Sequence, residues 1–195
     1  LSRLYTATGG PSWYAKNGWM DSDSCCDFDW VTCNGAGDVV ELDLGDNNLQ
    51  GQIPTQFGDL TSLKSGGTSS QGLFFGNLLT GTLPSEIGKL TQMKRHLALW
   101  NNQLSGSIPT QFGQLTDLTY NLCLNSNMLS FSIPTQLGQL KKLTAGVYLN
   151  TNSFCGEVPT ELQALSSSVT STWEVTTGNS IGTACPAPPT LTPTE

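Results

Sequence analysis

The side chains best able to bind a metal or act as nucleophiles are six cysteines and a single histidine. Three cysteines lie near the start of the chain, one near the middle and two near the end: Cys25, Cys26, Cys33, Cys123, Cys155 and Cys185. One histidine offers little help to a zinc site built from four such ligands. The spacing favours disulfides, which indicate an oxidising compartment reached by secretion, outside the cell or at its surface. We expect no metal and no cofactor.

The remaining titratable residues do not form a catalytic pattern. Hard cations such as calcium take several carboxylate oxygens, and four aspartates cluster near the start of the chain: Asp21, Asp23, Asp27 and Asp29. Their spacing matches no complete calcium loop, so a solvated acidic edge is the favoured interpretation. No nucleophile and carboxylate can be assigned to His96, for which we expect a surface or turn position. We therefore expect this protein not to be an enzyme.

Composition excludes two classes of partner. The net charge is -7 and only 12% of residues are charged, which argues against a surface that grips nucleic acid phosphates. No apolar stretch approaches the roughly 18 residues that a membrane span needs, so we expect no membrane insertion by this segment. The chain begins at Leu1 rather than Met, which predicts processing or truncation.

A repeated unit must position all of these side chains. Its prolines recur at intervals of 30, 25, 25 and 25 residues: Pro54, Pro84, Pro109, Pro134 and Pro159. Such a period is typical of a solenoid in which each unit forms one coil. Each unit also contains an L-x-L-x-x-N-x-L pattern, whose L-x-L part predicts a short strand with one buried face. We expect a turn after each strand.

Two columns of residues should stack from coil to coil. One is a column of asparagines whose amides can satisfy backbone groups left unpaired by the turns: Asn47, Asn77, Asn102, Asn127 and Asn152. The other is a column of glycines where the backbone needs a conformation that a side chain would hinder: Gly51, Gly81, Gly106 and Gly156. Phe131 occupies the glycine position in one coil. We expect local distortion there.

The full pattern includes a proline motif after each asparagine, namely IPTQFG twice, LPSEIG, IPTQLG and VPTEL. It resembles the plant-type leucine-rich repeat of receptor-like kinases, receptor-like proteins and polygalacturonase inhibitors. The resemblance covers about residues 4–185. It implies an α/β solenoid, a right-handed leucine-rich-repeat superhelix with a parallel concave sheet, irregular or 3-10 convex segments and disulfide-stabilised caps. The family unit has 24 residues, so the extra residue before three strands predicts a bulge or wider turn. The Ser- and Gly-rich segment 64–71 predicts a protruding, mobile loop.

The resemblance also implies the domain organisation and the cysteine pairing. We expect an amino-terminal cap at 1–38, about five coils at 39–165, a carboxy-terminal cap at 166–185 and a Pro/Thr-rich linker or tail at 186–195. Trp13, Trp19 and Trp30 can cover the first coil. In the family cap, the second cysteine of the CC pair bonds to the next cysteine, which implies Cys26–Cys33. At the other end the resemblance suggests Cys155–Cys185.

The two other cysteines should be unpaired. Cys123 lies on the outward side of a middle strand, too far along the solenoid to meet Cys25 in the cap. We expect no bond between them, and Cys123 is a candidate free surface thiol. In the family, the first cysteine of the pair often bonds to one further upstream, which would precede Leu1.

The outward strand positions form the candidate binding face for a protein or glycan partner, including subunits of a larger complex: Asp43, Phe75, Trp100, Asn125, Tyr148 and Asn150. Exposed Phe75, Trp100 and Tyr148 would offer the rigid aromatic area typical of a protein hot spot or a sugar platform. The competing interpretation is that these are incidental surface residues. Recognition through a preformed surface is the leading hypothesis for function.

Two alternatives remain open. A column of hydroxyls follows the prolines and could order water and bind ice, as in some similar repeat proteins: Thr55, Ser85, Thr110, Thr135 and Thr160. Further Ser and Thr residues precede three of the prolines: Thr80, Thr82, Ser105, Ser107, Ser130 and Ser132. Plant-type repeats commonly carry hydroxyls there without that activity. The resemblance also makes an inhibitor of cell-wall hydrolases a possible function.

Overall fold

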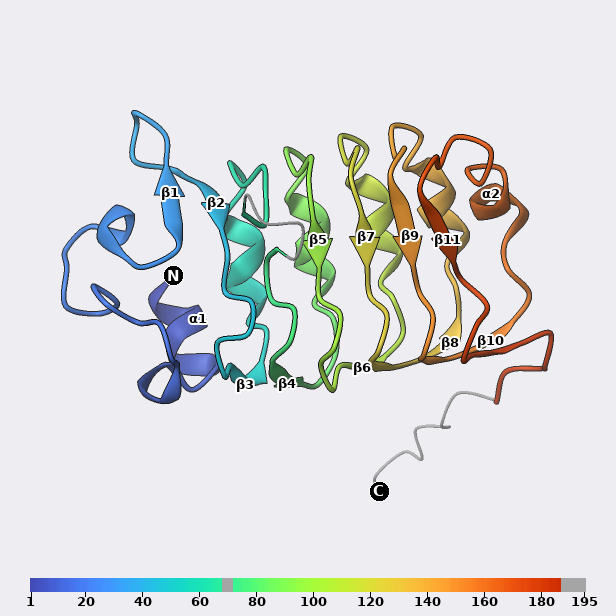
Figure 1. Ribbon diagram of the computed structural model, residues 1–195, viewed down its shortest axis with the longest axis horizontal. Coiled ribbons are helices and arrows are strands. Elements are labelled where there is room, and N and C mark those ends of the chain that lie inside the picture. Colours follow the sequence, from blue (N-terminus) through green and yellow to red (C-terminus); the bar gives the residue numbers. More distant parts are fainter. Residues whose placement is uncertain (68–71, 187–195) are drawn as a thin grey trace, which may run out of the picture.

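The protein is a stack of short coils, each contributing a strand to one face and a helix to the opposite face (Figure 1). The computed structural model describes residues 1–67 and 72–186. The sequence period explains this shape, because leucines spaced two residues apart turn inward from each strand and meet those of the neighbouring coils. The helices are α1 (Ser2–Ala7), η1 (Gly10–Ser12), η2 (Cys25–Asp27), η3 (Thr55–Asp59), η4 (Ser85–Lys89), η5 (Thr110–Gln114), η6 (Thr135–Gln139) and α2 (Thr160–Gln163), where η marks a 3-10 helix.

One parallel sheet forms the face expected to be concave. Its strand order is β11-β9-β7-β5, and these strands lie side by side in Figure 1. They are β5 (Leu97–Ala98), β7 (Leu122–Cys123), β9 (Gly146–Tyr148) and β11 (Thr172–Glu174). The antiparallel pair β1 (Val31–Cys33) and β2 (Val39–Leu42) precedes it at the amino-terminal end. Single parallel bridges connect the first coils, among them Asp43 with Leu73.

A second run of parallel strands, which we did not expect from the sequence, lies along another edge of the stack. It consists of β3 (Gln50–Gln52), β4 (Leu78–Thr80), β6 (Ser105–Gly106), β8 (Met128–Ser132), β10 (Ser153–Gly156) and β12 (Ser180–Ile181). These strands begin just after the asparagines, so neighbouring coils exchange backbone hydrogen bonds on both sides of each turn. The 3-10 helices after the prolines agree with the expectation for the opposite face.

The core is a single continuous column of leucine and phenylalanine side chains. Strand leucines such as Leu97, Leu122 and Leu149 have no exposed surface, and the helix residues Ile87 and Phe112 are equally buried. Phe74 replaces a strand leucine in the second coil and packs on Phe57, with ring centroids 5.0 Å apart. No coil could bury these residues alone, so stability depends on stacking.

The asparagine column forms a ladder between coils. Each side-chain oxygen accepts a backbone N–H from the preceding coil: Asn77 from Leu49 at 2.9 Å, Asn102 from Leu79 at 3.0 Å, Asn127 from Leu104 at 3.0 Å and Asn152 from Leu129 at 2.9 Å. The amide nitrogens donate to backbone carbonyls, as Asn127 does to Leu99 and Leu124. The expected structural role of this column is confirmed.

The extra residue before β5 and the extra residue before β7 each form a wider turn. The N–H groups of Thr119 and Tyr120 both donate to the Lys94 carbonyl, and those of Lys94 and Arg95 both donate to the Lys64 carbonyl. One acceptor therefore serves two donors, which accommodates the additional residue without leaving either N–H unpaired.

The described part of segment 64–71 does not protrude as expected. Ser65 is buried and bridges Glu41 to Arg95, so it takes a place in the first parallel sheet. Residues 68–71 lie outside the described residues, as does all of the expected tail except Pro186.

Phe131 does not distort the backbone of its coil as expected. Its φ is 66°, close to the 76° of Gly106 and the 72° of Gly156 at equivalent positions. The coil keeps the glycine conformation and the phenylalanine bears the strain, which costs about 1 to 2 kcal/mol for a residue with a Cβ atom.

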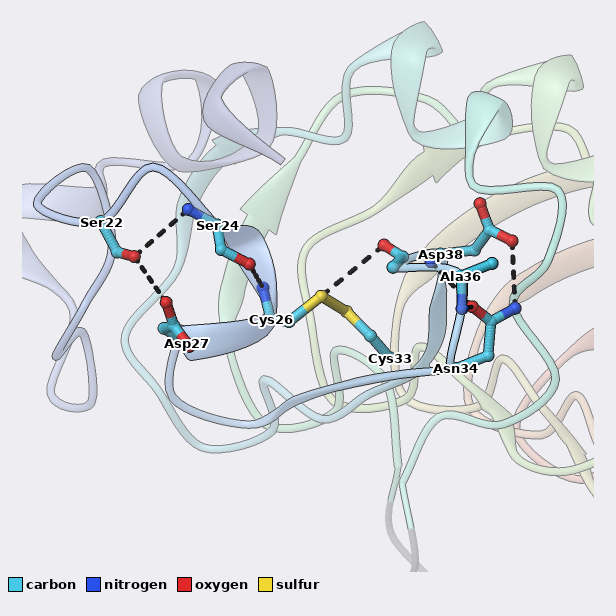
Figure 2. Close-up of a disulfide and its surroundings, with 9 residues drawn as sticks. Ser22, Ser24, Cys26, Asp27, Cys33, Asn34, Ala36 and Asp38 are labelled. Carbon is cyan, nitrogen blue, oxygen red and sulfur yellow. Dashed lines mark hydrogen bonds between the residues drawn. A yellow bond between two sulfur atoms is a disulfide. The ribbon is translucent and has the colours of Figure 1, made fainter.

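The amino-terminal cap covers the first coil with aromatic rings. Trp13 and Trp19 are buried, with ring centroids 4.8 Å apart, and Phe28 packs on Trp19. Trp30 does not join them, contrary to expectation, because 63% of its surface is exposed. The cap also contains the Cys26–Cys33 disulfide, the pairing that the resemblance implies (Figure 2).

The carboxy-terminal segment is more regular than its sequence indicates. It holds the Cys155–Cys185 disulfide, again the implied pairing. It also extends both sets of strands, since β11 pairs with β9 and β12 pairs with β10. Asn179 continues the ladder by accepting the Phe154 N–H at 3.1 Å. This segment is therefore a sixth, divergent coil.

Candidate functional site

A strip of aromatic and polar side chains crosses the first parallel sheet, and it includes most of the residues expected to bind a partner. Trp100, Tyr148, Asn125 and Asp43 are all half-buried. Phe75 is buried, with 5% of its surface exposed, so its expected exposure is wrong. The reason is its neighbour: Phe75 stacks on Trp100 with ring centroids 5.1 Å apart and an angle of 19° between the rings. Phe75 thus supports Trp100 within the strip.

Cys123 is the second correction. It faces outward from β7 as expected, but only 7% of its surface is exposed, so it is not a surface thiol. Trp100 and Tyr148 flank it on the same face of the sheet. Burial raises the pKa of the Cys123 thiol to about 12. A thiol that stays protonated is a poor nucleophile, which removes Cys123 from the candidates for covalent chemistry.

The strip has a hollow at each side of the Phe75–Trp100 stack. The N-terminal hollow has a volume of about 350 Å³, and its lining residues are Tyr14, Ala15, Trp30, Asp43, Gly45, Asp46, Asn47 and Phe75. Sequence reasoning missed Tyr14 and Trp30, which come from the cap. The tryptophan pattern shared with the family cap indicated a covering role for Trp30, and the sequence carries no signal for its exposure.

The second hollow has a volume of about 330 Å³, and its lining residues are Trp100, Asn121, Cys123, Asn125 and Tyr148. Gly146 makes room for the Tyr148 ring, since a Cβ atom there would lie 2.3 Å from the ring. Asn150 follows this strand but lines neither hollow. Its side-chain oxygen is buried, and among the described residues it has no hydrogen-bond partner. The second hollow is thus aromatic at its walls and amide-rich at its base.

His96 lies at the edge of this face, in the wider turn before β5. Its φ is 55°, and its buried Nδ1 has no hydrogen-bond partner among the described residues. Burial lowers the pKa of His96, the nearby Arg95 lowers it further, and Asp43 opposes them. The ring lies 5.8 Å from that of Tyr120, over which Arg95 is placed. Nothing in this surrounding resembles a nucleophile with its base.

Among the described residues, the aspartates of the cap form no group close enough to share a metal ion. Asp27 accepts a hydrogen bond from the Ser22 hydroxyl (Figure 2), and Asp29 accepts one from the Asn17 backbone. Within residues 1–67 and 72–186, the group of side chains close enough to share a metal ion is Cys25, Cys26 and Cys33. Two of these three are joined in a disulfide, which leaves only the Cys25 thiol.

The hydroxyl column lies on the helical side of the stack. All five of its residues are exposed, each at the first position of η3, η4, η5, η6 or α2. In four coils the hydroxyl donates to the side-chain oxygen of the next residue, as Thr110 does to Gln111. This regular surface is separate from the aromatic strip.

Comparisons with known proteins agree with the fold. A family model described as Leucine Rich Repeat matches residues 38–60 and 95–115. Receptor protein kinase WSS1 of Oryza sativa subsp. japonica is 47% identical over 70 residues, which are 35% of this chain and 7% of the kinase.

Two solved structures are similar over most of the chain. One is a chain in the crystal structure of the BIR3–SERK2 complex from Arabidopsis thaliana, with a TM-score of 0.62, 28% identity and coverage of 95% of this chain and 91% of that one. The other is a plant ice-binding protein, with a TM-score of 0.72, 33% identity and coverage of 92% and 54%.

Repeats, fold and similarities together define the class: the chain has the fold of a leucine-rich-repeat solenoid and resembles the ectodomains of plant receptor-like kinases. The chain spans about 7% of the length of the two curated receptor kinases it matches. Among the described residues, no helix is long and apolar enough to cross a membrane.

Proposed function

We propose that this protein recognises a partner protein, without catalysis, through the aromatic strip on its first parallel sheet. The observation that carries the proposal is the Phe75–Trp100 stack with a hollow on each side. Aromatic side chains that neighbouring residues already hold in place lose little entropy on binding, and such side chains dominate protein interfaces. The similarity to a chain of the BIR3–SERK2 complex supports a binding role.

The two disulfides support an oxidising location, and we propose an extracellular or cell-surface one. A receptor ectodomain or an assembly subunit fits this setting. We also propose that residues 1–38 act as a cap that seals the first coil and supplies one wall of the binding strip.

The test begins with capture of partners from the native source and identification by mass spectrometry. Trp100→Ala and Tyr148→Ala should each weaken binding of the captured partner by more than about 1 kcal/mol. Met128→Ala is the matched control, because Met128 is 53% exposed on the second set of strands. Circular dichroism must show that all variants are folded. Unchanged affinity in both strip variants would remove the strip from the interface.

A second candidate function is ice binding by the hydroxyl column. It is favoured by the exposure of all five hydroxyls and by the similarity to a plant ice-binding protein. An ice recrystallisation assay tests it, with Thr110→Asp and Thr135→Asp expected to abolish activity and Trp100→Ala expected to leave it intact. The absence of activity in the unaltered protein would reject this candidate.

A further inference from the structure

The N-terminal hollow combines aromatic walls with acidic side chains. Tyr14, Trp30 and Phe75 provide the walls, and Asp43 and Asp46 provide two carboxylates. No lysine, arginine or histidine is among the described residues that line it. We propose that this hollow binds an arginine side chain presented by the partner protein. The proposal rests on the proposed function, since it assigns the chemistry that one end of the strip recognises.

The aromatic walls suit a guanidinium group. A planar cation is attracted to the face of an aromatic ring, and tryptophan and tyrosine are the strongest such partners. Tyr14 is 78% exposed and Trp30 is 63% exposed, so both rings are accessible to a ligand. Arginine stacks on such rings more readily than lysine because its guanidinium is flat and weakly hydrated.

The backbone at Trp30 is strained while its ring remains exposed. Its φ is 64°, in the left-handed region that a residue with a bulky side chain rarely adopts. Strained residues of this kind persist where the surrounding structure fixes them, and they cluster at ligand-binding sites. Burial in the core cannot explain the conformation, because most of the Trp30 surface faces solvent. The conformation leaves the ring accessible to a ligand.

Hydrogen bonds fix the walls before any ligand arrives. The Asp43 N–H donates to the Trp30 carbonyl at 3.1 Å, and the Asp46 N–H donates to the Phe75 carbonyl at 2.9 Å. The Asn47 amide holds the cap segment by accepting the Ala15 N–H and donating to the Ala15 carbonyl. A preformed site loses less entropy on binding than a mobile one.

The floor of the hollow is bare backbone at Gly45. A Cβ atom at this position would lie 1.7 Å from the Phe75 ring, so only glycine allows Phe75 to lie flat against the chain here. The two carboxylates lie on either side of this glycine in sequence. Asp43 accepts the Gly45 N–H at 3.3 Å, and Asp46 is exposed.

The acidic side chains select the sign of the ligand's charge. The chain has a net charge of -7, and a hollow with low-dielectric walls strengthens the attraction of its carboxylates for a cation. A metal ion fits poorly, because aromatic rings offer no oxygen ligands and these carboxylates belong to no metal-binding group among the described residues. An arginine side chain satisfies both the rings and the charge.

The probe for the test is Nα-acetyl-arginine methylamide, titrated into the full chain and followed by NMR at the Trp30 indole N–H. The Trp30→Phe variant assigns that signal. The citrulline derivative is the neutral analogue of the same shape, and the lysine derivative carries the charge without the planar group. We expect the arginine derivative to bind about tenfold more tightly than either.

Two double variants distinguish the effect of the hollow's carboxylates on binding from the effect of the net charge of the protein. The double variant Asp43→Asn with Asp46→Asn keeps a side-chain oxygen that can accept the Gly45 N–H, and asparagine tolerates the left-handed backbone at position 46. This variant should no longer bind the arginine derivative more tightly than the citrulline derivative. Glu157→Gln with Glu161→Gln removes the same charge from the fifth coil and should leave the preference intact. Equal binding of the arginine and citrulline derivatives, equal binding of the lysine derivative, or loss of the preference in both double variants would each overturn the proposal.

The two proposals fail in different ways. If the arginine probe does not move the Trp30 signal but Trp100→Ala still loses the captured partner, the strip is the interface and the arginine pocket is rejected. If the probe binds as expected but the partner is unaffected by the strip variants, the pocket stands and the proposed interface is rejected.

Discussion

Replacing Asn127 with alanine tests whether the asparagine ladder holds the coils together. The Asn127 side chain accepts the Leu104 N–H at 3.0 Å and donates to the carbonyls of Leu99, Leu124 and Asn125. Alanine would leave the Leu104 N–H without this acceptor in the interior. The three carbonyls lose less, because each keeps another donor, such as Asn102 for Leu99 and Asn152 for Leu124.

The expected cost follows from this difference. A buried, unpaired N–H costs about 1 to 3 kcal/mol, and three partly compensated acceptors add a smaller amount, so we expect a total loss of roughly 3 kcal/mol. Urea unfolding followed by circular dichroism measures it. Asn125→Ala is the control, since that side chain lies in the second hollow, and it should change stability by less than about 0.5 kcal/mol.

Asn127→Asp sharpens the test. A carboxylate can still accept the Leu104 N–H but cannot donate to the carbonyls, so at neutral pH it should destabilise at least as much as alanine. Its pKa would be raised in the folded state, so the added penalty should appear as pH rises through the unfolded value of about 3.9 and shrink below it. A loss below about 1 kcal/mol for Asn127→Ala, or a pH-independent loss for Asn127→Asp, would refute the assigned role of the ladder.

Three further predictions concern single residues. The pKa of His96 is lowered in the folded protein. The contribution of His96 to stability should therefore be fully present above pH 6.5, roughly the ordinary pKa of histidine, and should decline as the pH falls below that value. His96→Asn should flatten this part of the plot of unfolding free energy against pH. Burial raises the pKa of Cys123 to about 12, so iodoacetamide at pH 8 should modify Cys25 well before Cys123, as measured by peptide mass mapping. Unfolding in urea should abolish this difference in rate. Rapid modification of Cys123 in the folded protein would contradict its burial. Gly106→Ala should cost about 1 to 2 kcal/mol of unfolding free energy, because φ there is 76°, whereas Gly35→Ala, where a Cβ meets nothing within 4 Å, should be nearly neutral.

The period of the prolines and asparagines predicted the stacked coils, the first parallel sheet and the ladder. These features depend on residues that recur at fixed positions, such as Asn102 and Asn127. The sixth coil escaped prediction because Asn179 follows Asn152 by 27 residues rather than 25. The second set of strands escaped as well, since exposed apolar residues such as Leu78 and Met128 interrupt its alternation.

The errors within the candidate site have a common physical cause. Alternation along a strand correctly indicated which side Phe75 and Cys123 face, but it cannot indicate how much of that side remains exposed. Exposure depends on the neighbouring coils. The Trp100 ring stacks on Phe75, and Trp100 with Tyr148 encloses Cys123. Large side chains in adjacent units therefore decide the accessibility of smaller ones, and a pattern within one unit carries no information about them.

The ladder makes the molecule extensible. Each asparagine side chain bonds within its own coil and to the coil before it, so a whole unit could be inserted or removed in the middle of the stack with every remaining amide still finding an equivalent partner. Such a change would lengthen or shorten the distance between the two caps without altering either end. The chemistry of the hollow at the first coil and the length of the surface can therefore vary independently in this architecture.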